Sequence, residues 1–241
     1  ISIGNITLGG TGKTPFVIYL ANSLKKLGKN PGIVSRGYNR DSKGLIIVHD
    51  GNELLVDVNT AGDEPYLIGT QLKNTPIIVS TNKVDGVTEL VKNNLVDIVL
   101  LDDAFQNRKI HRNADIVMIS AVEKLKYYHL LPWGKMRESL YNLKRANDII
   151  YSNTKEFETP SIHNYLTKYV DNISTTSIMK PILMKLDGME YQKVNSFDKG
   201  VFAFCGIGTP DSFFSSAEEL NLNIIGKKVF LDHKKYTSSI L

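Results

Sequence analysis

A glycine-rich segment near the start of the chain restricts the possible folds more than any other feature. Residues 7–14 read Thr-Leu-Gly-Gly-Thr-Gly-Lys-Thr. The apolar run at residues 1–8 predicts a strand that leads into this segment. Residues 14–27 then carry apolar side chains at helical spacing, with Pro15 in the first turn. A strand, a glycine-rich turn ending in Gly-Lys-Thr and a helix form the context that a phosphate-binding P-loop requires.

The residue types in this segment suit the polyphosphate of a nucleotide. Glycines let backbone N–H groups approach phosphate oxygens, and the N-terminus of the helix adds positive potential. We expect Lys13 to reach the β- and γ-phosphates and the Thr14 hydroxyl to hold Mg²⁺. A glycine-rich turn with a chance lysine is the alternative, and the P-loop is atypical because Thr7 stands where glycine is usual. The candidate nucleotide-binding residues are Thr7, Leu8, Gly9, Gly10, Thr11, Gly12, Lys13 and Thr14.

Strand and helix patterns alternate along the chain, and this alternation predicts a mostly parallel sheet. Residues 96–101 are almost continuously apolar, as in a strand buried on both faces. Residues 45–48 and 54–58 flank the turn Asp50-Gly51-Asn52 and predict a hairpin. The other predicted strands are 32–35, 77–80, 116–119 and 149–150, and the other predicted helices are 65–73 and 84–93. The expected fold class is therefore α/β: a P-loop NTPase-like, mostly parallel sheet flanked by helices.

A polar stretch at residues 153–159, closed by Pro160, marks a predicted domain boundary. We assign residues 1–155 to the P-loop core and residues 156–241 to a second, smaller α/β lobe. This lobe has predicted helices at 162–170 and 210–220, a strand pair around 179–186 and an apolar strand at 201–205. Because the chain begins within a predicted strand and ends without closing an element, we expect a fragment whose second lobe is incomplete.

Composition excludes several classes of protein. No apolar run approaches the 18 residues of a membrane-spanning helix. The single cysteine, Cys205, leaves no disulfide partner and no zinc cluster, and it suits a reducing compartment. The 29 basic and 25 acidic residues give a net charge of +4, well short of a nucleic-acid-binding arm. This charge is compatible with a phosphate-rich ligand or an anionic membrane surface.

Two acidic pairs stand where a P-loop enzyme needs carboxylates. Asp102 and Asp103 end the predicted buried strand, where a carboxylate holds Mg²⁺ or its water; a polar strand end is the alternative. Adjacent carboxylates repel each other unless a cation compensates. Asp63 and Glu64 start a predicted helix, and there the simpler interpretation is a helix cap with acidic residues in the first turn.

Three further motifs contain polar residues suited to a ligand. Ser35-Arg36-Gly37-Tyr38 follows the second predicted strand, at the edge of a parallel sheet where ligands bind. Residues 130–138 form a predicted loop with the only tryptophan and the pair Arg137-Glu138, which a surface ion pair would also explain. Asp232-His233 follows an apolar run, although a lone histidine is more often structural than catalytic.

In this order, the motifs resemble those of tetraacyldisaccharide 4′-kinase, the lipid A 4′-kinase family of Gram-negative bacteria. The resemblance spans nearly the whole chain, and the atypical Thr7 is part of it. It rests on Gly-Asn-Ile-Thr-Leu-Gly-Gly-Thr-Gly-Lys-Thr-Pro at 4–15, Ser-Arg-Gly-Tyr at 35–38, Gly-Asp-Glu-Pro at 62–65, Asp-Asp-Ala-Phe-Gln at 102–106, Leu-Leu-Pro…Arg-Glu at 130–138, Phe-Cys-Gly-Ile-Gly at 204–208 and Asp-His at 232–233.

This resemblance implies an enzyme that uses ATP and Mg²⁺ to phosphorylate the 4′-hydroxyl of a lipid A disaccharide 1-phosphate, forming lipid IVA. By motif position, Lys13 and Thr14 resemble the residues that hold phosphate and metal. Asp63 resembles the general base of the family, His233 its partner, and Arg137 an active-site cation. The acidic group around Mg²⁺ and the γ-phosphate would comprise Glu64, Asp102, Asp103 and Glu138.

The resemblance also implies a place in the cell. The family carries a hydrophobic N-terminal helix, absent from this sequence, that anchors it at the cytoplasmic face of the inner membrane. We therefore expect that membrane surface and the lipid A precursor as partners, and no nucleic acid. The sequence departs from the family at Ala104 and Asn107, where glycine and histidine are common, so Asn107 removes an imidazole. Lys234 and Lys235 likewise stand where a second histidine is common.

Two alternatives remain open on the sequence. A P-loop ATPase or GTPase switch that drives a protein partner would also use Lys13 and Asp102, but it does not need Asp63 and His233 or a lipid-facing surface. A fragment without activity is the second alternative, because the sequence lacks the anchor and the closing segment of the family.

Overall fold

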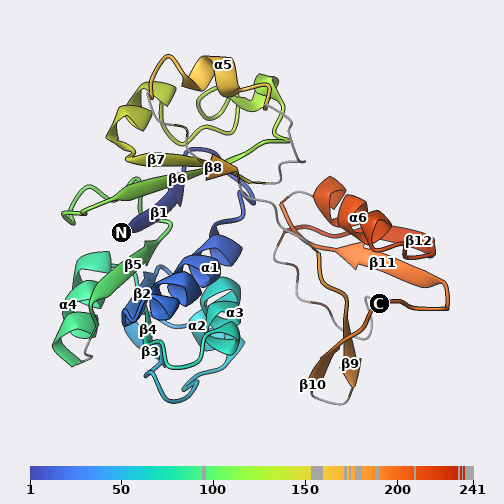
Figure 1. Cartoon of the computed structure of the whole chain (residues 1–241), viewed down its shortest axis with the longest axis horizontal. Coiled ribbons are helices and arrows are strands. Elements are labelled where there is room, and N and C mark those ends of the chain that lie inside the picture. Colours follow the sequence, from blue (N-terminus) through green and yellow to red (C-terminus); the bar gives the residue numbers. More distant parts are fainter. Residues whose placement is uncertain are drawn as a thin grey trace. The chain divides into compact units, whose positions relative to one another are not determined.

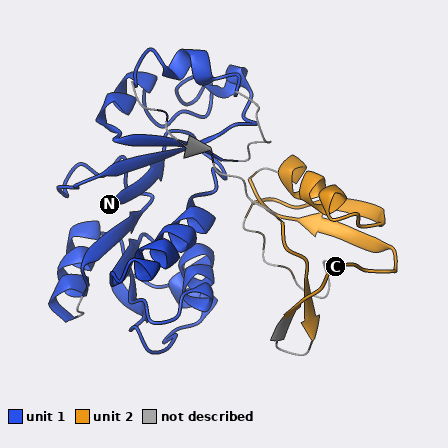
Figure 2. Ribbon diagram, viewed as in Figure 1, with its two compact units in different colours: residues 1–177 blue, residues 178–241 orange. Residues whose placement is uncertain are grey.

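The computed structural model describes residues 1–93, 96–152, 160–170, 173, 175–176, 181–187, 190–208, 210–232, 234 and 236. The chain divides into two compact units, residues 1–177 and 178–241, which Figure 2 colours separately. The sequence-based boundary near residue 155 falls inside unit 1. The reason is packing beyond that point: Ile162 and Leu166 join a core cluster of unit 1, and a short strand at Thr175–Thr176 pairs with its sheet.

Unit 1 is built on an eight-stranded sheet in the order β3-β4-β2-β5-β1-β6-β7-β8, which Figure 1 shows from the side. Its neighbours run parallel except for β3, which is antiparallel to β4. This architecture confirms the predicted mostly parallel α/β sheet. The strands are β1 Ser2–Asn5, β2 Pro31–Ser35, β3 Leu45–His49, β4 Ile77–Ser80, β5 Ile98–Asp102, β6 Asp115–Ser120, β7 Asp148–Ser152 and β8 Thr175–Thr176.

Helices cover both faces of this sheet, because successive residues of a strand point to opposite faces. Ile33 and Leu100 pack in one core cluster with residues of α1 and α3, whereas Val34 and Leu101 pack in another with Leu90 of α4. Figure 1 shows α4 on the opposite side of β2 and β5 from α1. The helical elements of unit 1 are α1 Lys13–Lys26, α2 Val58–Ala61, α3 Asp63–Gln71, α4 Lys83–Asn93, α5 His163–Leu166 and the 3₁₀ turns η1 Leu125–Tyr127 and η2 Leu140–Arg145.

Unit 2 contains two small sheets and one longer helix among its described residues. β9 (Met184–Asp187) and β10 (Glu190–Lys193) are antiparallel, and β11 (Val201–Cys205) and β12 (Ile224–Val229) are parallel, with α6 (Pro210–Glu219) between the latter two in sequence. The predicted strand at 201–205 and helix from residue 210 are confirmed. Cys205 is buried in β11. In the part of the chain that the structure describes, no helix has the length and apolar character needed to cross a bilayer.

Three of the local predictions differ from the structure. The predicted strand at 54–58 is reduced to a single bridge between Leu54 and His49, because the Asp57 side chain accepts a hydrogen bond from the Thr60 N–H at 2.9 Å and starts α2 at Val58. The predicted helix at 162–170 shortens to α5, four residues long. The first strand also ends at Asn5 rather than at residue 8, so most of the glycine-rich segment is loop.

Parallel strands bring distant motifs to one edge of the sheet. β1, β2 and β5 lie side by side, so the glycine-rich loop, the Arg36 loop and the Asp102-Asp103 turn all leave their carboxyl ends. Gly4 of β1 allows the segment after the Asp102-Asp103 turn to approach β1 closely, since a Cβ there would lie 2.5 Å from the Phe105 Cβ. The fold thereby gathers the predicted site residues of unit 1.

Candidate active site

The glycine-rich loop has the backbone shape expected of a phosphate-binding loop. Gly9 and Gly12 have φ values of 107° and 74°, in the left-handed region that favours glycine. Gly12 is the N-cap of α1, so Lys13 and Thr14 occupy its first turn, where backbone N–H groups point outward. Thr7, Thr11 and Thr14 are buried. The predicted sequence of strand, loop and helix is confirmed.

Asp102 lies at the carboxyl end of β5, the strand between β2 and β1, as predicted. The residue is 1% exposed, and its Oδ2 atom accepts a hydrogen bond from the Ser35 hydroxyl at 2.7 Å. Its Oδ1 atom is buried and has no hydrogen-bond partner within the described residues. A buried carboxylate oxygen without a partner is costly unless a cation or water meets it. Asp102 therefore has an oxygen to offer to a ligand.

Asp103 joins two cations. Its Oδ1 atom lies 3.7 Å from Lys13 Nζ and 2.7 Å from Arg137 Nη1. Its backbone has a φ of 48°, unusual for a residue other than glycine, and this turn directs it away from the strand. Burial alone would raise the pKa of Asp103, but the charges of Lys13 and Arg137 outweigh it and hold the pKa below the usual value.

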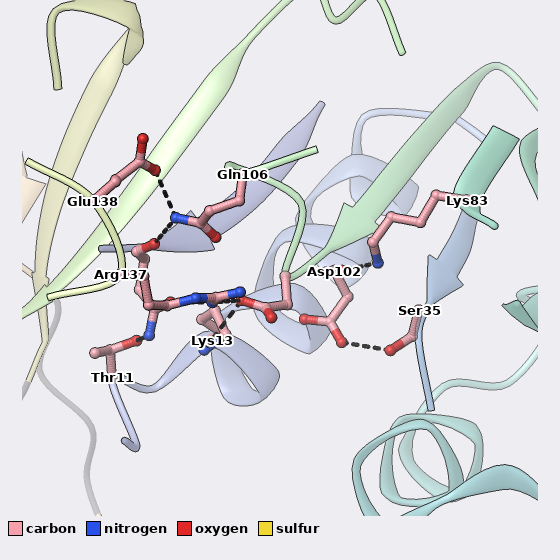
Figure 3. Close-up of polar contacts among 10 residues, drawn as sticks. Thr11, Lys13, Ser35, Lys83, Asp102, Gln106, Arg137 and Glu138 are labelled. Carbon is pink, nitrogen blue, oxygen red and sulfur yellow. Dashed lines mark hydrogen bonds and ion pairs between the residues drawn. The ribbon is translucent and has the colours of Figure 1, made fainter. Parts of the chain in front are cut away.

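Arg137 extends this arrangement to the start of the loop (Figure 3). Its Nη1 atom also donates to Asn5 Oδ1 at 3.0 Å, and Asn5 Nδ2 donates to Thr11 Oγ1 at 3.0 Å. The backbone N–H of Arg137 donates to the Ile6 carbonyl at 2.7 Å. The segment that carries Arg137 is thus held against the phosphate-binding loop by both main chain and side chain.

Glu138 was predicted to belong to the acidic group around Mg²⁺, but its carboxylate contacts other protein side chains. Its Oε1 atom accepts from Gln106 Nε2 at 2.7 Å, and its Oε2 atom pairs with Arg145 at 2.9 Å. Gln106 Nε2 also donates to the Asn5 carbonyl at 2.8 Å. Both carboxylate oxygens are therefore engaged by protein groups, and the structure places Glu138 beside the site without bringing it into contact with Asp102 or Asp103.

Glu64 belongs to the acidic group around the loop. It lies in the first turn of α3, and burial, followed by the charge of Asp102, raises the pKa of its carboxyl above the usual value. A hydrogen bond with Thr14 and the charge of Lys13 act in the opposite direction. These influences place Glu64 close to the first turn of α1, as a residue of the same electrostatic site.

The described residues hold no cluster of three acidic, histidine or cysteine side chains with metal-binding geometry. Magnesium in kinases is commonly held by one or two protein oxygens together with substrate phosphates and water. The buried Asp102 Oδ1 atom and the Thr14 hydroxyl are oxygen donors of that kind. The residues present fit a Mg²⁺ ion that arrives with its nucleotide.

Of the two residues predicted to act in proton transfer, the structure describes Asp63 but not His233. Asp63 is exposed in the first turn of α3, directly after Gly62, whose φ of 90° requires glycine. His233 lies outside the described residues, and Asp232 is exposed in unit 2. The proposed pairing of Asp63 with His233 stays a prediction.

Lys83 is a site residue that the sequence analysis missed. It starts α4, is 5% exposed and donates a hydrogen bond to the Asp102 carbonyl (Figure 3). Burial lowers the pKa of its ammonium group, and the charges of Asp102 and Asp103 oppose that shift. The position of Lys83 at the start of a helix was a signal in the sequence. A cation in the first turn interacts unfavourably with the helix dipole, so its presence there points to a different role.

The Arg36 loop forms a cavity beside these residues. The cavity has a volume of about 300 Å³ and is lined by Arg36, Gly37, Tyr38, Asn39, Arg40, Ser42 and Thr81. Thr81 directly follows β4, two residues before Lys83 begins α4, and Arg36 directly follows Ser35, the hydrogen-bond partner of Asp102. A cavity with two arginines in its lining suits an anionic ligand next to the phosphate-binding loop.

Comparisons with known proteins agree on one family. The family model described as tetraacyldisaccharide-1-P 4′-kinase matches residues 1–241. The tetraacyldisaccharide 4′-kinase of Chlorobium phaeobacteroides is 37% identical over 245 residues, covering 99% of this chain and 69% of the relative. That of Chlorobaculum parvum is 36% identical, covering 100% and 68%. The crystal structure of LpxK from Aquifex aeolicus in complex with ATP matches with a TM-score of 0.75 at 30% identity, over 98% of this chain and 72% of that one.

Proposed function

The chain belongs to the tetraacyldisaccharide-1-P 4′-kinase family, and we propose that it transfers the γ-phosphoryl group of ATP to the 4′-hydroxyl of a tetraacyldisaccharide 1-phosphate. One observation carries the proposal at the level of the site: Lys13, Arg137 and Asp103 meet at the mouth of the phosphate-binding loop. Phosphoryl transfer depends mainly on positioning and on positive charge around the transferring group, and this arrangement supplies both.

Each group of site residues has a separate role in the proposed reaction. The loop N–H groups and Lys13 bind the β- and γ-phosphates, and Arg137 adds a second cation at the transferring group. Thr14, Asp102 and Glu64 would hold Mg²⁺, whose charge, when the ion is bound, neutralises the phosphate oxygens. Asp103 keeps Lys13 and Arg137 oriented toward each other until the nucleotide replaces it as their anionic partner.

A sugar hydroxyl is a weak nucleophile at neutral pH, so the reaction needs a base. We assign this role to Asp63, which stands at the exposed start of α3, next to Glu64. Asp63 takes the proton of the 4′-hydroxyl as the new O–P bond forms and the bond to the β,γ-bridging oxygen breaks, leaving ADP. His233 would orient Asp63, as the match of Gly62-Asp63-Glu64-Pro65 and Asp232-His233 to the motifs of the family implies. Glu138 holds Gln106 and Arg145 beside the site rather than serving as a metal ligand.

The acceptor determines where the enzyme works. A disaccharide with four acyl chains resides in a membrane, and ATP is supplied from the cytoplasm, so the enzyme acts at the cytoplasmic face of the inner membrane. The lipid acceptor also separates this function from a nucleotide-dependent switch, whose hydrolysis would respond to a protein partner.

The proposal is tested by product analysis. The purified chain is incubated with ATP, Mg²⁺ and a detergent-dispersed tetraacyldisaccharide 1-phosphate, and the lipid is examined by ³¹P NMR. We expect a second phosphomonoester signal, coupled to the proton at the 4′ carbon. ATP hydrolysis with an unchanged lipid would instead support the switch and overturn the proposal.

A further inference from the structure

Four apolar side chains stand exposed beside the phosphate-binding loop. Leu8 of that loop is 47% exposed, and Leu130, Leu131 and Trp133 are 48%, 50% and 87% exposed. We call these four residues the Trp133 tip. Leu8 N–H donates to the Lys135 carbonyl at 2.7 Å, which joins the phosphate-binding loop to the segment that carries the other three. Leu130, Leu131 and Trp133 lie in the connection between β6 and β7, and Leu8 lies in the phosphate-binding loop between β1 and α1.

The tip is displayed by an ordered turn. Trp133 N–H donates to the Leu130 carbonyl at 2.9 Å, and Leu131 N–H donates to the Met136 carbonyl at 3.1 Å. Met136 is buried, so it fastens the turn to the core cluster that also contains Phe105. Gly134 is needed for this close packing, because a Cβ there would lie 2.4 Å from the His129 carbonyl oxygen. An ordered, hydrogen-bonded turn therefore holds these apolar side chains at the surface.

Lysines border the tip. Lys124 and Lys126 are exposed on the adjoining segment, and Lys126 and Lys135 lie 5.1 and 4.5 Å from the centre of the Tyr127 ring. Glu123 pairs with Lys135 at 3.0 Å, so Lys124 and Lys126 remain as cations without that neutralisation. Val122 and Leu125 of the same segment are also exposed, at 56% and 38%. The surface combines an apolar centre with a basic border.

A surface with an apolar centre and a basic border is suited to the interface of an anionic bilayer. Tryptophan concentrates at the headgroup level of membranes, and lysines are attracted to anionic lipids there. Arg137 and Glu138 follow the tip in sequence after three residues, and the Arg137 guanidinium contacts Asp103. If the Trp133 tip is held in the bilayer interface, Arg137 and the phosphate-binding loop lie at the level of the lipid headgroups.

We propose that the Trp133 tip inserts into the interfacial layer of a bilayer that contains anionic phospholipids. The inference rests on the proposed function in one respect, because an acceptor with four acyl chains gives the site a reason to meet a membrane. The acyl chains of the acceptor and a second copy of this chain are the competing occupants of the same apolar surface.

The fluorescence of Trp133 tests this directly, since it is the only tryptophan of the chain. Vesicles of phosphatidylglycerol and phosphatidylethanolamine are added without ATP and without acceptor. We expect the emission to shift to shorter wavelength, the shift to diminish with salt, and brominated acyl chains to quench the signal. Vesicles of phosphatidylcholine alone should give a smaller shift. An emission that stays at the wavelength of exposed tryptophan in every vesicle overturns the proposal.

Sedimentation with vesicles supplies the matched variants. Trp133→Ser combined with Leu131→Ser should lower partitioning by about tenfold or more, because two apolar side chains no longer enter the interface. Leu27→Ser is the control: Leu27 is 75% exposed at the far end of α1 from the phosphate-binding loop. Equal losses in both variants would overturn the proposal, as would full partitioning of the double variant. Thermal melting establishes that each variant is folded.

The remaining outcomes distinguish the occupants. A fluorescence shift that requires the acceptor lipid, and is absent with phospholipid vesicles, assigns the tip to acyl chains of the substrate and contradicts insertion. A shift that grows with protein concentration in the absence of lipid assigns it to a second copy. Lys13→Ala should bind vesicles like the unmodified chain while lacking transfer, so vesicle binding and the proposed function can fail independently.

Discussion

Arg137 Nη1 lies 2.7 Å from Asp103 Oδ1, although 34 residues separate them in the chain. The same carboxylate oxygen lies 3.7 Å from Lys13 Nζ. Three elements meet at this point, because Lys13 starts the helix after β1, Asp103 follows β5, and Arg137 lies in the connection between β6 and β7. Two cations held by one carboxylate form an electrostatic site that a phosphate can enter by taking the place of the carboxylate.

Replacing Arg137 with alanine tests the second cation. The transferring phosphoryl group would lose one charged donor, and removal of one such donor typically lowers kcat by about 10²- to 10³-fold. Steady-state kinetics with ATP and the acceptor lipid should show the loss mainly in kcat. Arg108→Ala removes the same charge from an exposed position and serves as the control. Equal kinetics for the two variants would remove Arg137 from the reaction.

Lys83 provides a prediction about stability. Its ammonium group is buried against the Asp102 carbonyl, so Lys83→Met leaves the buried Asp102 carboxylate with less positive charge nearby. We expect the free energy of unfolding in urea to fall by about 1.5–3 kcal/mol, the range for hydrogen bonds that involve charged groups. Lys83→Arg should recover most of the loss, and Lys92→Met, on the exposed side of α4, should have little effect. Undiminished stability of Lys83→Met would show that other cations compensate Asp102.

Glu64 gives the folded state a pH dependence. Burial raises the pKa of its carboxyl above the ordinary 4.5, so the folded state binds this proton more tightly than the unfolded state. The resulting stability is fully present below pH 4.5 and is lost as the pH rises through the raised pKa. Glu64→Gln mimics the protonated form, so it should become more stable than the unmodified chain as the pH rises to neutrality.

Urea unfolding at a series of pH values, with EDTA present, measures this difference. Glu53→Gln, at an exposed position, is the matched control and should follow the unmodified chain. A stability difference for Glu64→Gln that stays constant with pH would mean that the carboxyl does not change its pKa on folding.

The assignment of Asp63 and His233 leads to a test of coupling. If the two residues act as one unit, Asp63→Ala and His233→Ala each lower kcat, and the double variant loses little more than the worse single variant. Additive losses would indicate separate roles. Unchanged kinetics for His233→Ala would leave Asp63 without this partner.

Local sequence patterns were sufficient for the parts of the site that follow single strands. The glycine-rich loop and Asp102 each follow an apolar run, and parallel pairing of β1 with β5 brings them together without further information. Lys83 was missed because its burial arises from packing of α4 over β2 and β4, which no local pattern contains. The Glu138 contact with Arg145 is likewise created by the fold.

The failed strand prediction at 54–58 has a similar cause. Alternating apolar residues at Leu54 and Val56 fit a strand, and Asp57 fits a helix cap equally well. Packing decided between them, because Leu54 and Val56 lie against the core cluster of α1 and α3 from an irregular segment. Periodicity over so few residues does not distinguish a strand from a packed loop.

The most direct measurement of the central claim is the transfer of ³²P from γ-labelled ATP to a tetraacyldisaccharide 1-phosphate by the unmodified chain, by Lys13→Ala and by the exposed control Lys29→Ala. The account predicts labelled lipid with the unmodified chain and with the exposed-site variant Lys29→Ala, and none with Lys13→Ala, because we propose that Lys13 binds the transferring phosphate. Labelled lipid formed by Lys13→Ala at the rate of the unmodified chain would contradict it.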